Sequence, residues 1–288
     1  MKKKLSFLGF GEAAQTFSVA PGWRGDAAGF DIKTDAPASK VAKLADFNRA
    51  GVEARMSCAD AVSEAGLVLS LVTADQAVAA AINAASYIRP GSYYLDMNSV
   101  APASKQAASE AITSAGGHYI DVAVMAPVQP AALNVPLLLS GPHAASAEDA
   151  LRQLGFAQVR LIGERVGDAS AIKMIRSVMI KGIEALTAEC LLAAEAAGVT
   201  AEVLATLGGD WPERANYNLD RMLVHGLRRA AEMDEVCRTL SDLGIDPLLS
   251  RGTAARQRAL GARGLNPPPP DLASKLAAIA NLAEVPPA

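Results

Sequence analysis

The feature that most constrains the fold is a glycine-rich turn near the amino terminus, Gly9-Phe10-Gly11-Glu12-Ala13-Ala14. It follows a short apolar run and leads into a helical pattern, as in the G-x-G-x-x-A form of the dinucleotide-binding fingerprint. In this motif the first glycine permits a tight turn, the second lets the backbone approach a pyrophosphate, and the small last residue lets the helix pack on the strand. The helix N-terminus then directs N–H groups at the phosphates. The alternative is a tight turn with no ligand.

An acidic residue follows at the expected distance, because Asp31 lies about 20 residues after the turn, at the end of a second apolar run. A carboxylate at this place accepts hydrogen bonds from the adenosine ribose hydroxyls and repels a 2′-phosphate. The sequence therefore favours NAD as the cofactor. Lys33 is two residues further on and would meet a 2′-phosphate, so NADP stays the alternative.

Strand and helix signals alternate through the first 160 residues or so. The strand-like runs are 5–10, 29–32, 67–72, 93–96, 119–124, 137–140 and 159–162, and the Ala-rich helical stretches include 36–50, 75–87 and 102–115. Several runs are continuously apolar, which is typical of strands that are covered on both faces. The pattern predicts a Rossmann-type α/β domain with a parallel sheet.

Strand signals end near residue 163, and the rest of the chain is helical in pattern. The predicted helices are 168–197, 201–207, 215–243, 248–262 and 271–282, with Asp168 as a candidate N-cap and Gly198 as the end of the first. We therefore expect an NAD(P)-binding Rossmann-like domain at 1–164 and an all-α substrate and dimerisation domain at 165–288, joined by a long helix.

Composition excludes several classes of function. The 27 Lys and Arg against 30 Asp and Glu leave a net charge of −3, and only 5% of the residues are aromatic, so no nucleic-acid surface is expected. No uncharged apolar run reaches about 18 residues, so we expect no membrane span. The three histidines are scattered, so we expect no metal site. Three cysteines without a C-x-x-C pair indicate reduced thiols and a cytoplasmic protein.

Three later stretches, together with the glycine turn, resemble the β-hydroxyacid dehydrogenases, a family that includes 3-hydroxyisobutyrate and 6-phosphogluconate dehydrogenases. The stretches are Asp96–Pro102, Asp121–Pro127 and Gly167–Ser177. In the second, Met125 begins the Met-Ala-Pro that replaces the family's Ser-Gly-Gly; in the third, Ser177 replaces the usual asparagine. The chain resembles a divergent branch of the family, with a helical domain of unknown function.

The resemblance implies an NAD(P)-dependent oxidoreductase that transfers a hydride to or from a small hydroxy acid or related alcohol. Lys173 falls on the family's catalytic lysine and is expected to act as general acid and base, which requires a pKa lowered toward the operating pH. Asn98 and Ser99 fall on the loop beside the nicotinamide; their alternative role is to cap the helix that begins at Pro102. The expected cofactor-binding residues are Gly9, Phe10, Gly11, Glu12, Ala13, Asp31, Lys33, Thr73, Asn98 and Ser99.

Two helical stripes carry further polar candidates. Ser177, Lys181 and Glu184 share one face of the helix that bears Lys173, and Arg221, His225, Arg228 and Glu232 share one face of the next long helix. The first stripe is either the lining of a cleft or a solvated face. The second is either a site for an anionic substrate, because arginine pairs bidentately with carboxylates, or a set of surface ion pairs. We expect Met125, Ser177, Lys181 and Arg228 to contact a small, anionic substrate.

The broad apolar faces of the helical half predict a homodimer or larger closed oligomer. Two other functions remain open at this point. An imine-reducing enzyme of the same fold would have altered polar residues in the substrate pocket. A non-catalytic, cofactor-binding sensor would have lost the Ser-Gly-Gly and the asparagine, although Lys173 argues against it.

Overall fold

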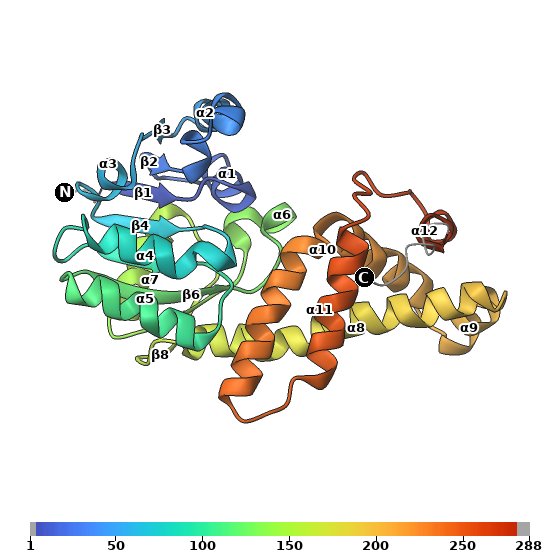
Figure 1. Ribbon diagram of the computed structural model, residues 1–288. Helices are drawn as coiled ribbons and strands as arrows, with labels where there is room; N and C mark the ends of the chain where they lie inside the picture. Colours follow the sequence, from blue (N-terminus) through green and yellow to red (C-terminus); the bar gives the residue numbers. More distant parts are fainter. Residues whose placement is uncertain (1–3, 281–288) are drawn as a thin grey trace. The chain divides into compact units, whose positions relative to one another are not determined.

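The computed structural model describes residues 4–280. The chain divides into two compact units, the first ending at Met174 and the second beginning at Ile175. One long helix, α8 (Asp168–Ala196), contributes to both (Figure 1).

The first unit is built on one eight-stranded sheet. Its strands are β1 (Leu5–Leu8), β2 (Ala27–Phe30), β3 (Glu53–Ala54), β4 (Leu67–Ser70), β5 (Tyr93–Asp96), β6 (His118–Val124), β7 (Leu137–Ser140) and β8 (Val159–Gly163). The order is β3-β2-β1-β4-β5-β6-β7-β8. The strands β2 and β3 therefore lie on one side of β1, and the strands from β4 onward lie on its other side. In doubly wound sheets, ligands bind outside the carboxyl ends of the strands at the point where the strand order reverses, here between β1 and β4. The predicted Rossmann-type α/β domain is confirmed, and a helical region follows it.

Two strands depart from the parallel sheet that the sequence predicted, because β7 runs antiparallel to β6 and β8 runs parallel to β7. Parallel neighbours need a long crossover, usually through a helix that packs on the sheet. The connection from β6 to β7 contains only the single turn α6 (Val128–Ala131) and the 3₁₀ turn η3 (Ala132–Asn134). With no crossover helix, the chain returns along its neighbour in the opposite direction.

Helices cover both faces of the sheet. They are α1 (Glu12–Ser18), α2 (Pro37–Arg49), α3 (Cys58–Val62), α4 (Ala77–Ala85), α5 (Pro102–Ser114) and α7 (Ala144–Leu154), with the 3₁₀ turns η1 (Ile32–Thr34) and η2 (Ala74–Gln76). Both α2 and α5 begin at proline, whose fixed φ suits the first helical position. Helix α7 is followed by its C-cap residue Gly155, which has a left-handed φ of 107°. Gly155 lies directly against the backbone of Gly22.

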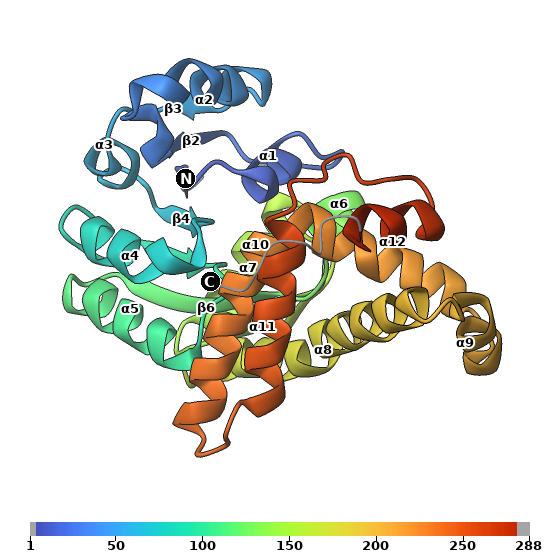
Figure 2. The ribbon, with the colours of Figure 1, turned by 45° about the vertical axis from the view of Figure 1, so that its right-hand side comes forward.

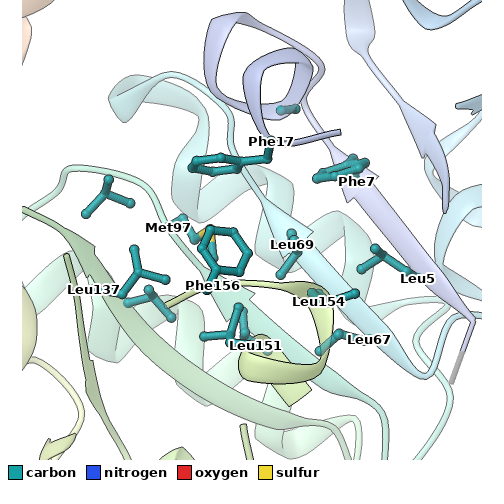
Figure 3. Packing of buried hydrophobic residues seen from close by; sticks show 14 of the residues in the cluster. Leu5, Phe7, Phe17, Leu67, Leu69, Met97, Leu137, Leu151, Leu154 and Phe156 are labelled. Carbon is teal, nitrogen blue, oxygen red and sulfur yellow. The ribbon is translucent and has the colours of Figure 1, made fainter. Parts of the chain in front are cut away.

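The core of this unit lies on the two faces of the sheet. On one face, Phe17 of α1 and Leu151 of α7 pack against Phe7 and Leu69, together with Phe156 (Figure 3). On the other face, small residues of α4 and α5 pack against Val68, Tyr94 and Tyr119, among others. Fully burying each large apolar side chain stabilises the fold by roughly 1.5–3 kcal/mol.

The second unit is helical. After its part of α8 come α9 (Thr200–Leu207), α10 (Trp211–Asp242), α11 (Leu248–Gly261) and α12 (Leu272–Ala280). The predicted helix at 271–282 corresponds to α12, and its last two residues lie outside the described residues. Helices α10 and α11 run side by side (Figure 2). A Cβ on Gly226 would lie 2.3 Å from the Gln257 carbonyl oxygen, so the two helices touch through backbone there.

Candidate functional site

The glycine turn is held tightly between β1 and the strand beside it. Gly9 has a φ of +82° and donates its N–H to the Phe30 carbonyl oxygen at 2.9 Å. A Cβ at this position would lie 2.5 Å from the Leu71 carbonyl oxygen, so both the φ and the space require glycine. Gly11, in contrast, has a negative φ, and a Cβ there would meet no atom within 4 Å. The space over Gly11 is therefore open.

Asp31 lies beside this turn, at the carboxyl end of β2. Its side chain is buried, Oδ2 accepts the Phe10 N–H at 2.7 Å, and Oδ1 accepts the Lys33 N–H at 2.9 Å. Each carboxylate oxygen keeps a further lone pair, so Asp31 is both fixed in place and still able to accept hydrogen bonds. The side chain of Lys33 is exposed.

Lys43, which is not among the residues predicted from the sequence, also supports the turn. Its buried Nζ donates to the Phe10 carbonyl oxygen at 2.7 Å and pairs with Asp46 Oδ2 at 2.8 Å. The hydrogen bond from Lys43 is the main cause that holds the pKa of Asp46 below its usual value. Lys43 and Phe47 are four residues apart and are the buried residues of α2, so the spacing in the helix was the available signal.

These features fit a phosphate-bearing dinucleotide. The turn leads into the first turn of α1, whose N–H groups have no partner within the helix. Glu12 is exposed and Ala13 is half-buried, so this end of α1 is accessible. Thr73, which the sequence placed in the same site, is the exposed N-cap residue of η2, and after the hydrogen bond from Gln76 its side chain helps to lower the pKa of Asp75.

A row of polar side chains crosses the sheet at one register. Ser70, Asp96, Asp121 and Ser140 are paired neighbours on β4, β5, β6 and β7, and all four are fully buried. Side chains at one register point to the same face of a sheet. The row therefore places two buried carboxylates next to each other, flanked by two hydroxyls.

Lys105 of α5 neutralises this row. Its side chain is fully buried, and Nζ lies 3.0 Å from Asp96 Oδ1 and 3.4 Å from Asp121 Oδ1. Nζ also donates to the Asp96 carbonyl oxygen at 2.6 Å. Tyr119 donates its hydroxyl to Asp96 Oδ2 at 2.6 Å. Burial and the charges of Asp96 and Asp121 raise the pKa of Tyr119 well above its usual value, so this phenol stays a donor.

The first carboxylate of the row anchors the loop after β5. Asp96 Oδ1 accepts both the backbone N–H and the Nδ2 of Asn98, at 2.9 and 2.7 Å, and Nδ2 also donates to Ser70 Oγ at 3.0 Å. Asn98 is thus buried under the loop, and its Oδ1 has no hydrogen-bond partner within residues 4–280. Neither Asn98 nor Ser99 caps α5, as the alternative interpretation had it, because the N-cap position belongs to Ala101.

The second carboxylate of the row anchors the start of α8. Asp121 Oδ2 accepts the Ser170 N–H at 2.9 Å and the Ser140 hydroxyl at 3.1 Å. Ser140 Oγ in turn accepts the Ala169 N–H at 3.0 Å. Two orphan N–H groups of the first turn of α8 are therefore satisfied by the sheet rather than by a local cap.

Lys173 and Ser99 meet between these two anchored segments. Lys173 lies one turn along α8, and its partly buried Nζ donates to Ser99 Oγ at 2.5 Å. Both residues were predicted at the site, from two separate stretches of the sequence. The structure joins them by a direct contact inside the first unit.

Met125 lies near the same end of α8, in an apolar setting. Its N–H donates to the Pro136 carbonyl oxygen at 2.9 Å, and its side chain packs against the buried group formed by Ala123, Leu138 and Ala169. It borders a surface pocket of about 390 Å³, whose lining also includes Ile172 of α8. The side chain of Met125 therefore makes apolar contacts with both the sheet and α8.

The other predicted substrate residues belong to the second unit. Ser177, Lys181 and Glu184 are all buried, so the alternative of a solvated face is wrong for this stripe. Lys181 Nζ lies 2.8 Å from Glu232 Oε2, and Arg228 Nη1 lies 2.6 Å from Glu232 Oε1. Lys181 and Arg228 are therefore brought together by one carboxylate of α10, although the Arg228 side chain is about half exposed.

Metal sites and membrane-spanning helices are two further classes of feature that the described residues lack. Among residues 4–280, no three His, Cys, Asp or Glu side chains are grouped so that they could hold a metal ion. Over the same residues, no helix has both the length and the apolar character needed to cross a membrane.

Two family descriptions match parts of the chain. Residues 27–161 match the NAD binding domain of 6-phosphogluconate dehydrogenase. Residues 194–260 match a domain of unknown function, DUF1932.

Solved structures match nearly the whole chain. A conserved hypothetical protein from Sinorhizobium meliloti 1021 is 36% identical, with a TM-score of 0.73, over 98% of this chain and 97% of that one. The conserved protein MTH1747, of unknown function and described as similar to 3-hydroxyacid dehydrogenases, is 30% identical, with a TM-score of 0.67, over 90% and 97%. The 3-hydroxyisobutyrate dehydrogenase of Mycobacterium tuberculosis, solved with L-serine, shares the fold at 17% identity and a TM-score of 0.73, over 99% and 100%.

Proposed function

This chain belongs to the β-hydroxyacid dehydrogenase-like family, in a branch whose helical domain is of unknown function, and from this premise we propose an NAD(P)-dependent oxidoreductase. It acts on a small hydroxy acid or related alcohol, with Lys173 as general acid and base. The contact from Lys173 Nζ to Ser99 Oγ carries this proposal, because it puts the lysine against the loop that borders the nicotinamide in the family.

Each part of the site has one role in the proposed reaction. A nicotinamide cofactor held at the glycine turn and Asp31 would supply or accept the hydride. Lys173 Nζ takes the hydroxyl proton as the carbonyl forms and returns it in the reverse reaction. The backbone at Gly9, Gly11 and α1 binds the pyrophosphate, and Asp31 binds the adenosine ribose.

The test is a screen of hydroxy acids, polyols and cyclic imines for hydride transfer. The absorbance of the reduced nicotinamide is monitored for each compound. Turnover of a hydroxy acid or alcohol supports the proposal. Tight cofactor binding without turnover of any candidate would instead indicate a cofactor-binding sensor.

An imine-reducing enzyme is the second candidate, and Met125 is the observation that favours it. Its side chain packs among apolar residues where the family has a hydrogen-bonding serine. An apolar substrate surface suits a cyclic imine better than a carboxylate, whose desolvation is costly without hydrogen bonds. Turnover of cyclic imines alone in the screen would select this candidate.

Cofactor choice gives the first prediction. We expect NAD to bind more tightly than NADP, and Asp31→Ala to reduce that preference about tenfold, because a charged acceptor for the ribose hydroxyls is lost. Binding of both cofactors is measured by fluorescence titration. Lys33→Ala is the control, and it should leave NAD affinity unchanged. Tighter binding of NADP by the unaltered protein would show that Lys33 outweighs Asp31.

The two glycines of the turn give a matched pair of variants. Gly9→Ala should destabilise the fold by at least about 1–3 kcal/mol, because it combines a positive φ with a clash against the Leu71 carbonyl. Gly11→Ala should leave stability nearly unchanged and weaken cofactor binding about tenfold, because its Cβ occupies only the space where the pyrophosphate approaches. Urea unfolding and cofactor titration separate the effects. Normal cofactor affinity in Gly11→Ala would exclude this binding mode.

Assembly gives a third prediction. We propose that residues 1–164 bind the cofactor and that residues 165–288 bind substrate and form a homodimer or larger closed oligomer. Ile175, Met179 and Leu186 are large apolar residues of α8 that are at least half exposed. We expect light scattering to give at least twice the chain mass at micromolar concentration. The double variant Met179→Glu with Leu186→Glu should lower it. Val41→Glu, on an exposed apolar residue of α2, should not. A monomeric mass for the unaltered protein would contradict the proposal.

A further inference from the structure

The second unit holds a cluster of charged side chains with more cations than carboxylates. The cluster consists of Lys181 and Glu184 of α8 and of Arg221, Arg228, Arg229 and Glu232 of α10. It thus contains four cations and two carboxylates. An excess of positive charge among buried and half-buried groups is unfavourable unless something neutralises it.

Both carboxylates of the cluster are already paired. Glu184 is buried, and its Oε2 accepts hydrogen bonds from Arg229 and, at 2.8 Å, from Gln257 Nε2 of α11. Glu232 lies between Lys181 and Arg228. Two buried polar atoms of the same group, Arg229 Nε and Gln257 Oε1, have no hydrogen-bond partner among the described residues.

The other carboxylates of α10 near the cluster are paired elsewhere. Asp220 lies 2.8 Å from Lys275 Nζ of α12, and Asp234 lies 2.7 Å from an Arg258 nitrogen of α11. Glu235 pairs with Arg238 on its own helix. None of these ion pairs involves Arg221.

Arg221 is therefore the cation of the cluster that has no salt-bridge partner of its own among the described residues. It is half-buried, and it forms no hydrogen bond or salt bridge with any other described residue. Burial first, and then the charges of Arg229 and Arg228, lower the pKa of its guanidinium, and the charge of Glu184 offsets them only in part. A guanidinium cannot relieve this repulsion by losing its proton near neutral pH, because its pKa remains far above that range. It can relieve it by binding an anion.

We infer that Arg221 binds an oxyanion group, a carboxylate or a phosphate, of a small anionic ligand, in a site whose positive field comes from Arg228 and Arg229. The planar guanidinium offers two parallel N–H groups, which match two oxygens of either group. The excess of two positive charges over the carboxylates favours a dianion. This inference does not depend on the proposed hydride transfer, because it concerns binding alone.

The scaffold of the site is rigid, which favours specific binding over a loose ion atmosphere. Helices α10 and α11 touch at Gly226 and Gly261, where a Cβ on Gly261 would lie 2.4 Å from the Leu227 nitrogen. Gln257, which holds Glu184, lies on this contact. Sites on packed helices hold their ligands more precisely than sites on loops do.

Four polar residues of α10 were predicted from their spacing to share one helix face, and Arg228 was the one expected to contact the substrate. The structure distinguishes the arginines by their partners. Arg228 is about half exposed and paired with Glu232, whereas Arg221 is half-buried and unpaired. A spacing pattern contains no information on which residue is paired by another helix.

The test is binding of inorganic phosphate, malonate and acetate to the full chain without cofactor, by calorimetry at constant ionic strength. The unaltered protein should bind phosphate or malonate more tightly than acetate, and the ratio of the first two identifies the oxyanion. Arg221→Gln should weaken binding by about tenfold or more, and Arg221→Lys should retain part of it, because lysine keeps the charge but not the bidentate geometry. Arg251→Gln, on an exposed arginine of α11 paired with Asp246, is the control.

Thermal unfolding without any anion gives an independent readout. If Arg221 were only structural, Arg221→Gln would lower the melting temperature. A binding role predicts an unchanged or higher melting temperature, because an unpaired, half-buried charge is removed. The inference is overturned if neither phosphate nor malonate binds the unaltered protein at millimolar concentration, or if Arg221→Gln binds them as well as the unaltered protein does.

Discussion

Replacing Lys173 with methionine should lower kcat by about 10²–10⁴-fold while leaving cofactor affinity unchanged, because the variant loses the group that moves the hydroxyl proton. Methionine is similar in length and fills the space of the lysine stem without the amine. The cofactor's predicted pyrophosphate and adenosine contacts are with the glycine turn and Asp31, which lie on other elements, and Ser99 beside the nicotinamide stays in place in this variant. The measurement is steady-state turnover of a substrate found in the screen, together with a cofactor titration.

Two companion variants make this result specific. Ser99→Ala removes the acceptor of the Lys173 hydrogen bond and should lower kcat less than Lys173→Met does, because the amine remains. Arg165→Met changes an exposed cation that pairs with Asp168 at the start of α8, and it should leave kcat near normal. Near-normal kcat in Lys173→Met would show that another group transfers the proton.

The elements of the Rossmann-type unit could be predicted from sequence wherever local pattern decides them. The runs at 93–96 and 137–140 coincide with β5 and β7, because short apolar segments bounded by turns are strong strand signals. The two-residue strand β3 was missed, since Glu53–Ala54 has no pattern of its own and pairs only through β2. The direction of β7 was missed because it depends on how the chain connects, not on its residues.

The candidate site could be predicted only in part, because some of its residues are brought together by strand pairing and not by a local motif. The glycine turn, Asp31 and Lys173 belong to motifs with fixed spacing. Lys105 does not, yet it lies three residues before Ala108 and seven before Ile112, on the buried face of α5. That spacing was visible in the sequence, but a lysine on an apolar face is normally explained by an exposed amine at the end of its stem. Only the register of β5 and β6 reveals the two carboxylates that bind it.

Lys105→Met should lower the free energy of unfolding of the first unit by about 3–5 kcal/mol, the usual cost of removing one partner from a buried ion pair. Asp96 and Asp121 are both fully buried, and Lys105 is the cation that lies between them. Without it, two adjacent carboxylates face each other in a medium of low dielectric. Lys4→Met, on an exposed lysine paired with the exposed Glu64, should leave stability nearly unchanged.

Urea unfolding can be confined to the first unit by its tryptophan. Trp23 packs on Phe7 and Phe156 in that unit, whereas the other tryptophan, Trp211, begins α10. In a Trp211→Phe background, fluorescence therefore reports on the unit that contains Lys105.

A double variant separates charge from packing. Adding Asp121→Asn to Lys105→Met removes one of the two unpaired carboxylates and keeps an oxygen that can accept the Ser170 N–H at the start of α8. If uncompensated charge causes the loss, the double variant should be more stable than Lys105→Met alone, although each change by itself is destabilising. Additive losses in the two variants would mean that Lys105 acts through packing of its stem. The ion pair would then not be what holds the loop after β5 and the start of α8 in register, and the Lys173–Ser99 contact would need another source of rigidity.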